Sequence, residues 1–259
     1  MVNMKKIIVG LFYALLSFVM LLPILGIIMK GLNLKIWIYI LNLAQTYNSL
    51  LITFLIILIT IVINIFIGTP VAFFMAKEKF KGKIVLEGLI ALPLIIPTMV
   101  SAMGLQYAFI KLGLIESVMG VSIVHSIATI PYYIQSMRIG YMTLNKDYIS
   151  FGKIMGANKA EIFIKIVLPL IYPSFLLGIS LIIIVSLAQY LITFIIGGGA
   201  IITLPILMMP YLVNGDITNG AVYSIIYVVF TYCLVFLLEK TIKKIYRKRD
   251  KNDRDKEFI

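Results

Sequence analysis

The sequence is poor in charge and in the side chains that build metal sites and covalent catalytic sites. Only 13% of its 259 residues are charged and 61% are apolar, whereas soluble domains carry about 25% charged residues. A single cysteine, Cys233, excludes a disulfide framework and a cysteine-built metal site. A single histidine, His125, lacks the partners that a metal site needs. We therefore expect no metal or cofactor, and the composition argues against a soluble enzyme and a disordered chain.

Short catalytic and nucleotide-binding motifs are also missing. The sequence contains no His-Glu-x-x-His, no Gly-x-Ser-x-Gly and no Walker loop. We therefore expect no catalytic residues on this chain, and we expect it to bind no nucleotide.

Long uncharged apolar runs are present instead. A helix that crosses the hydrocarbon core of a bilayer needs about 20 residues. The glycine cluster Gly197-Gly198-Gly199 divides the longest uncharged stretch and leaves an outer loop after it. The sequence therefore predicts an all-α membrane protein with six transmembrane helices, over residues 7–29, 49–76, 88–110, 117–137, 174–196 and 217–238.

The basic residues indicate which side of the membrane each loop faces. Six spans place both termini on one side, together with the loops at 77–83 and 138–165. That side carries 20 of the 23 Lys and Arg residues, and loops rich in Lys and Arg stay in the cytoplasm. We predict a multi-pass protein of a prokaryotic cell membrane with both termini cytoplasmic. The net charge of +12 then needs no nucleic-acid partner.

The loop between the fourth and fifth spans has the pattern of two short helices. Asp147 is placed to cap a helix over residues 148–155, and Gly156 suits a left-handed turn at its end. Asn158 begins a second helix, with Glu161 three residues later as in a capping box. Such a pair is typical of a docking element for another protein. The alternative is an amphipathic loop that lies on the membrane surface.

Within this loop a Gly-Ala pair, an isoleucine and a Leu-Pro pair occur at fixed spacing, and they resemble the coupling motif of binding-protein-dependent ABC importer permeases. That motif reads Glu-Ala-Ala, three residues, Gly, nine residues, Ile, one residue, Leu-Pro. Its glycine, isoleucine and Leu-Pro positions hold here, whereas the triplet is replaced. The resemblance implies that an ATPase contacts the loop. The residues assigned to this coupling are Ser150, Phe151, Gly152, Met155, Gly156, Ala157, Ile166, Leu168 and Pro169.

Other segments resemble the same family, in the family's order, from residue 48 to residue 240. They are Asn48-Ser49-Leu50 with Gly68-Thr69-Pro70, Leu92-Pro93-Leu94-Ile95-Ile96-Pro97, His125 with Ile130-Pro131-Tyr132, and Thr203-Leu204-Pro205. The last of these resembles the iron, thiamine and polyamine branch. We accordingly divide the chain into a first transmembrane helix with an outer segment (1–47), a permease core (48–242) that contains the coupling loop (143–169), and a basic cytoplasmic tail (243–259).

The fifth span carries a narrow stripe of small and polar residues. Gly178, Ser186, Gln189 and Thr193 fall within an arc of about 80° on a helical wheel. Small and polar residues pack helices together in membranes, so one interpretation is internal packing. The other is a surface that faces a partner permease or the substrate pathway.

Two features of the third and fourth spans also have a structural and a functional interpretation. Pro93 and Pro97 each remove a backbone hydrogen bond, so we expect a kink there, with a moving gate as the alternative. His125 is expected to make a structural hydrogen bond, to Ser126 or to a neighbouring helix.

The resemblance implies a type I ABC importer permease subunit that is not itself an enzyme. Its partners would be an ATPase dimer, an extracytoplasmic substrate-binding protein and a second permease, for which a different chain is favoured over a second copy. A small solute would pass between the permeases, and polyamine, thiamine and iron all stay open. The alternatives are an ion-coupled secondary transporter, which would carry intramembrane carboxylates, and a membrane-embedded enzyme, which would carry paired catalytic residues.

Overall fold

The computed structural model describes the backbone of residues 2–257 and the side chains of residues 6–145 and 147–240. The described part is helical, without a strand. Its helices are α1 (Val2–Gly31), α2 (Leu34–Asn42), α3 (Ala44–Lys77), α4 (Lys83–Ile95), α5 (Thr98–Lys111), α6 (Val118–Thr143), α7 (Lys146–Ile154), α8 (Lys159–Ile162), the π-helical turn η1 (Phe163–Val167), α9 (Leu168–Leu170), α10 (Tyr172–Leu187), α11 (Tyr190–Gly197), α12 (Leu204–Val213) and α13 (Ile217–Glu257). The charges of the predicted basic tail, 243–259, lie on side chains outside these ranges.

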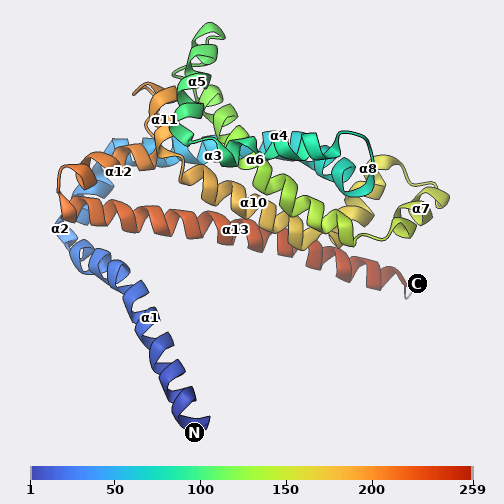
Figure 1. The fold of residues 1–259 in the computed structure, drawn as a ribbon, viewed down its shortest axis with the longest axis horizontal. Helices are drawn as coiled ribbons and strands as arrows, with labels where there is room; N and C mark the ends of the chain where they lie inside the picture. Colours follow the sequence, from blue (N-terminus) through green and yellow to red (C-terminus); the bar gives the residue numbers. More distant parts are fainter. Residues whose placement is uncertain (1, 258–259) are drawn as a thin grey trace.

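Helix α6 lies between α3 and α10 in an elongated bundle, and α13 packs against α10 (Figure 1). Helix α6 packs mainly on α3 and α10, and the packing is close because two glycines face one aromatic ring. A Cβ atom at Gly68 of α3 would lie 2.6 Å from Cδ1 of Tyr133, and one at Gly178 of α10 would lie 2.9 Å from its Cδ2. The ring of Tyr133 is fully buried between them, so the two glycines set the distances of α3 and α10 from α6.

Polar side chains also join α3 to α6 inside the bundle. The Asn64 amide donates to the Thr129 hydroxyl at 2.9 Å, and the Thr60 hydroxyl donates to the Ser122 carbonyl at 3.3 Å. All four residues are fully buried. Hydrogen bonds of this kind join helices in membranes, where apolar burial alone provides little net attraction between helices.

Three helical segments of the described chain are long and apolar enough to cross a bilayer: Lys6–Gly31, Ala44–Lys77 and Ile217–Lys240. They coincide with the predicted first, second and sixth spans. Two bent helix pairs are also long and apolar enough if each counts as one span, which gives up to five spans. They are Lys83–Ile95 with Thr98–Lys111, and Lys159–Leu170 with Tyr172–Leu187. Helix α6, which holds the predicted fourth span, is not among these segments.

The third span is broken, as its prolines predict. Helices α4 and α5 meet at 103°, and the break falls at Ile96 and Pro97. Ile96 is extended, with φ −75° and ψ 128°, because the ring of a following proline disfavours helical backbone. Pro93 stays inside α4, so Pro97 alone breaks the helix.

Two predicted elements need correction. The fifth span, 174–196, is not one continuous helix, because α10 ends at Leu187 and α11 starts at Tyr190. The predicted outer loop before the sixth span contains helix α12, which starts at Thr203-Leu204-Pro205, a favourable helix start because proline suits the first turn. The glycine cluster ends α11 as expected, with φ +55° at Gly198.

Helix α1 leaves the bundle at a steep angle (Figure 1). Its described apolar side chains are exposed, and it contacts the bundle near Gly31, where a Cβ would clash with Cδ1 of Ile225 in α13. The Trp37 indole of α2 donates to the Gly31 carbonyl at 2.6 Å and ties the end of α1 to α2.

Candidate functional site

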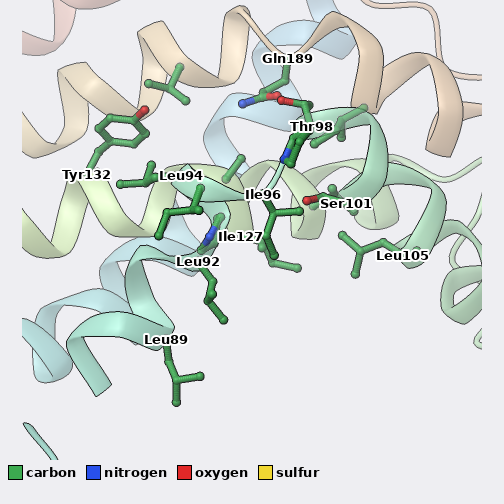
Figure 2. A pocket seen from close by; sticks show the side chains of 18 residues that line it. Leu89, Leu92, Leu94, Ile96, Thr98, Ser101, Leu105, Ile127, Tyr132 and Gln189 are labelled. Carbon is green, nitrogen blue, oxygen red and sulfur yellow. The ribbon is translucent and has the colours of Figure 1, made fainter. Parts of the chain in front are cut away.

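A cavity of about 670 Å³ lies where the third and fifth spans are broken. Its walls come from α4, α5, α6, α10 and α11, and most of its side chains are aliphatic (Figure 2). The polar side chains in its lining are Thr98, Ser101, Tyr132 and Gln189, and none of the lining residues is charged. The cavity is therefore an apolar recess with a few neutral hydrogen-bonding groups.

The part of the cavity wall between α4 and α5 includes backbone that is not helical. Pro97 precedes the first residue of α5, and no side chain caps this helix start. The first N–H groups of a helix have no partner within the helix, so those from Thr98 onward lie at the break. On the other side of the break, Glu87 of α4 forms an ion pair with Arg138 of α6 at 3.0 Å, which joins α4 to the centre of the bundle.

Gln189 reaches the cavity from the turn between α10 and α11. Close to this turn His125 is almost fully buried, at 3% exposure. Its Nδ1 lies 2.7 Å from the Ser186 hydroxyl and its Nε2 lies 2.8 Å from the Thr193 hydroxyl. The expected bond to a neighbouring helix is therefore present, while Ser126 donates instead to the Ser122 carbonyl.

The predicted stripe of the fifth span is divided by the break. Gly178, Ser186 and Thr193 are buried against α6, through Tyr133 in the first case and His125 in the other two. Gln189 alone lines the large cavity. Sequence reasoning missed the other polar lining residues, and the proline pair was the only signal near them.

The long loop holds the expected helix–turn–helix. Gly156 has φ +78°, its N–H donates to the Lys153 carbonyl at 3.0 Å, and the Ala157 N–H donates to the Gly152 carbonyl at 3.0 Å. These two bonds define a Schellman motif, which requires a left-handed residue at the glycine position. The predicted cap needs correction: Asn145, not Asp147, caps α7, because Asn145 is the extended residue before the helix and its Oδ1 accepts from the Asp147 N–H.

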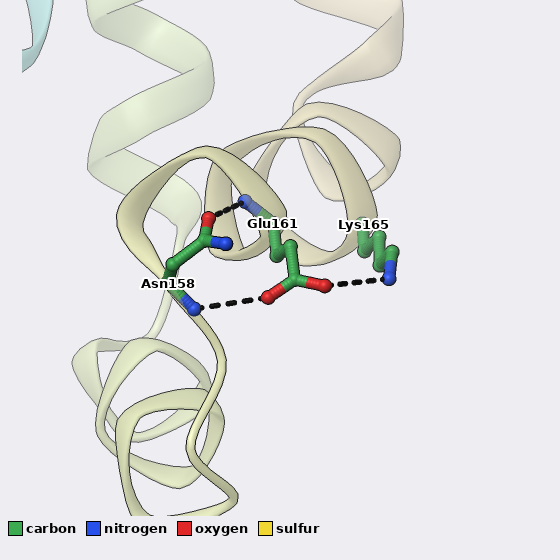
Figure 3. Close-up of polar contacts among 3 residues, drawn as sticks. All are labelled: Asn158, Glu161 and Lys165. Carbon is green, nitrogen blue, oxygen red and sulfur yellow. Dashed lines mark hydrogen bonds and ion pairs between the residues drawn. The ribbon is translucent and has the colours of Figure 1, made fainter.

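The second helix starts with the predicted capping box (Figure 3). The Asn158 side chain accepts from the Glu161 N–H at 2.9 Å, and Glu161 accepts from the Asn158 N–H at 3.1 Å. Lys165 donates to the other Glu161 oxygen at 3.0 Å. The Lys165 hydrogen bond first, and then the Asn158 N–H, lower the pKa of Glu161 below its usual value, so this carboxylate is charged at neutral pH.

The predicted coupling residues divide into exposed and inward-facing groups. Phe151 and Met155 are 64% and 84% exposed, and Ser150 and Gly156 are also exposed. The inward-facing group holds the loop together: a Cβ on Gly152 would lie 2.7 Å from Cδ1 of Ile166. The remaining three, Ala157, Leu168 and Pro169, are partly buried.

Two exposed apolar residues of α7, Tyr148 and Ile154, were missed by the sequence analysis. The spacing of Tyr148, Phe151 and Met155, at i, i+3 and i+7, marks one helix face and was the available signal. We call Tyr148, Phe151, Ile154 and Met155 the α7 apolar surface. Helix α7 itself lies at the end of the bundle, beyond α8 (Figure 1).

The comparisons with known proteins agree on one kind of relative. A family model described as "Binding-protein-dependent transport system inner membrane component" matches residues 68–248. The chain is 26% identical over 260 residues to the probable transport system permease protein NifC of Clostridium pasteurianum, which covers 93% of this chain and 90% of NifC. It is 24% identical over 213 residues to the putative molybdenum transport system permease protein YvgM of Bacillus subtilis, with coverages of 76% and 94%.

A solved structure shares the fold. It is a crystal structure of a bacterial ABC transporter involved in the import of the acidic polysaccharide alginate. The TM-score is 0.73 at 16% sequence identity, over 93% of this chain and 96% of that one. These values support the arrangement of helices described above.

Proposed function

Because the chain belongs to the family of inner membrane components of binding-protein-dependent transport systems, we propose that it is the permease subunit of an ABC importer and that its cavity forms part of the wall of the passage. The family implies partner ATPases, a substrate-binding protein and a second permease. We propose that the second permease is a different chain. ATP hydrolysis belongs to the partner subunits, so this chain is not an enzyme.

The observation that carries this function is the α7 apolar surface. Four apolar side chains stand exposed on a short helix whose position is set by the Schellman turn at Gly156 and the capping box at Asn158. An exposed apolar patch of this kind marks a protein contact. We assign it to the ATPase, together with the exposed residues Ser150 and Gly156.

We further propose six membrane crossings, by α1, α3, α4 with α5, α6, α10 with α11, and α13. Both termini and the loop at 143–169 then lie in the cytoplasm, since 20 of the 23 basic residues share that side. The divisions at 1–47, 48–242 and 243–259 follow from this topology.

Cysteine labelling tests the topology. In a Cys233→Ser background, cysteines at Lys81 and Lys159, both exposed and both in proposed cytoplasmic loops, are expected to resist an impermeant thiol reagent added to intact cells. A cysteine at Asn214, exposed at the end of α12, is expected to react. All three should react after permeabilisation, and external labelling of Lys81 or Lys159 positions would refute the six-span arrangement.

For the substrate we propose a molybdate-like oxyanion. The support is the name of YvgM, a putative molybdenum transport permease, and a cavity whose few polar side chains are neutral hydroxyl and amide groups, without a carboxylate. A carboxylate would repel a dianion, and a cation would find no counter-charge there. The family-model match confirms the predicted family, while the iron, thiamine and polyamine branch has no counterpart in the relatives described above.

Reconstitution tests the function. Proteoliposomes containing this permease, the second permease, the ATPases and the binding protein are expected to take up labelled molybdate only with ATP. Sulfate and spermidine serve as comparison substrates. ATP-dependent uptake of spermidine but not of oxyanions would overturn the substrate class alone, whereas uptake driven by an ion gradient without ATP would indicate a secondary transporter.

A further inference from the structure

We propose that His125 is a positioning residue that holds the turn between α10 and α11 and so keeps the Gln189 side chain in the cavity wall. Ser186, in the last turn of α10, and Thr193, in the first turn of α11, both bond to this one ring. The inference rests on the proposed function, since the position of Gln189 matters only if solute passes that wall.

The hydrogen bonds assign the proton on the ring. The Thr193 hydroxyl has one hydrogen, and it is donated to the Gln189 carbonyl at 2.5 Å. Thr193 therefore accepts from His125, and the ring hydrogen is on Nε2. A neutral ring with its hydrogen on Nε2 accepts at Nδ1, so the Ser186 hydroxyl donates. The result is a directed chain from Ser186 through His125 and Thr193 to the Gln189 carbonyl.

The surroundings of the ring favour this neutral form. A void of about 10 Å³ beside His125 is lined by apolar groups and by hydroxyl and amide side chains, with no acidic residue among them. A charged imidazolium without a counter-charge is costly at membrane depth. The ring therefore acts as one donor and one acceptor, which matches its two hydroxyl partners.

No helix-breaking residue in the sequence marks this turn. Residues 187–190 contain neither proline nor glycine, and Gln189 leaves the helical region with φ −83° and ψ 55°. Its N–H donates to the Ser186 carbonyl at 3.2 Å, and the Tyr190 N–H donates to the Ala188 carbonyl at 3.0 Å, so the backbone bonds of the turn span only two or three residues. The bonds from His125 to both flanking helices supply the link that an uninterrupted helix would have provided.

His125 is itself fixed by the centre of the bundle. Its carbonyl accepts from the Thr129 hydroxyl at 2.8 Å, and that hydroxyl accepts from the Asn64 amide of α3 at 2.9 Å. All three residues are buried. The contacts between α3 and α6 therefore fix the position of the turn and of Gln189, and α10 alone does not.

A spectroscopic test needs no transport assay. His125 is the only histidine of the chain, so histidine labelled with ¹⁵N reports one ring when the full-length permease is purified in lipid nanodiscs without a polyhistidine tag. The expected spectrum is that of a neutral ring with its hydrogen on Nε2. A ring with its hydrogen on Nδ1, or a doubly protonated ring, would overturn the hydrogen-bond assignment even if the proposed function stands.

The functional test compares substrate moved per ATP hydrolysed in the reconstituted complex. His125→Leu removes both hydrogen bonds of the ring and is expected to lower this ratio at least about fivefold, the effect of losing one hydrogen bond, while binding-protein-stimulated ATP hydrolysis persists. His125→Gln, whose amide can still donate to Thr193, should recover most of the loss. In a Gln189→Leu background, His125→Leu should add no further loss, because it acts through Gln189.

A purely structural role predicts other results. Transport and ATP hydrolysis would then fall together with the amount of folded complex, and the two substitutions would add. Ser126→Ala is the matched control, because that hydroxyl bonds within α6 and not to the ring. If His125→Leu does not fold, Ser186→Ala and Thr193→Val each remove one partner and carry the same expectation. An unchanged ratio in both would overturn the proposal.

Discussion

Gly156→Val is expected to abolish uptake and to reduce co-purification of the ATPase, while the permease stays in the membrane at normal levels. Gly156 has φ +78° and no atom lies within 4 Å of a Cβ placed on it, so valine meets no neighbour. Its cost is backbone strain of about 1–3 kcal/mol, which the loop relieves by opening the Schellman motif and turning α7 away from α8. Uptake, membrane content and ATPase retention are measured together.

Two variants separate docking from general strain. Gly156→Asn should retain most activity, because asparagine tolerates a left-handed backbone better than other residues with a side chain. Gly82→Val is the matched control: Gly82 has φ +90° and equally open surroundings, but lies in the other loop proposed to be cytoplasmic. Normal uptake and normal ATPase retention in Gly156→Val would refute the assignment of the α7 apolar surface.

Gly178→Leu is expected to cause the largest loss of folded protein. A Cβ at this position already lies 2.9 Å from Cδ2 of Tyr133, and that ring cannot move away because Gly68 of α3 contacts its other edge. Overpacking of a core costs about 1–3 kcal/mol and sometimes more, and here it would separate α10 from α6. We expect a lower thermal midpoint and less monodisperse protein after detergent extraction.

The control for this prediction is Gly88→Leu, a helical glycine of α4 with no atom within 4 Å of its Cβ position, which should extract like the parent. Combining Gly178→Leu with Tyr133→Ala should restore part of the stability, since the alanine vacates the volume that the leucine needs. If Gly178→Leu alone has the same thermal midpoint as the parent protein, α10 can shift without cost. Internal packing would then not be the reason for a glycine at position 178.

The features that could be predicted are those whose cause is local. The break at Pro97 follows from a missing N–H and a proline ring, and the capping box at Asn158 follows from side chains three residues apart. The positive φ at Gly156 belongs to the same class. Choosing Asp147 over Asn145 as the cap of α7 failed because both side chains can cap a helix, and only backbone geometry distinguishes them.

The features that could not be predicted depend on residues far apart in the chain. The turn at Gln189 has no proline or glycine, and the side-chain bonds that join its two flanking helices come from His125, more than sixty positions earlier. The cavity combines residues from Leu89 to Ile192, so no local pattern marks it. The stripe from Gly178 to Thr193 was drawn on one continuous helix, and the turn moves Gln189 away from its other members.

The two broken spans have a consequence for hydration. Backbone outside a helix survives at membrane depth only where it is buried in protein or borders water, because lipid offers it no hydrogen bonds. Pro97 and Gln189 mark both breaks, and both line the same recess. Acyl chains therefore cannot cover this side of the subunit, even though most side chains there are aliphatic; water or the second permease must lie against it. The main chain, and not the side-chain composition, decides what can cover the recess.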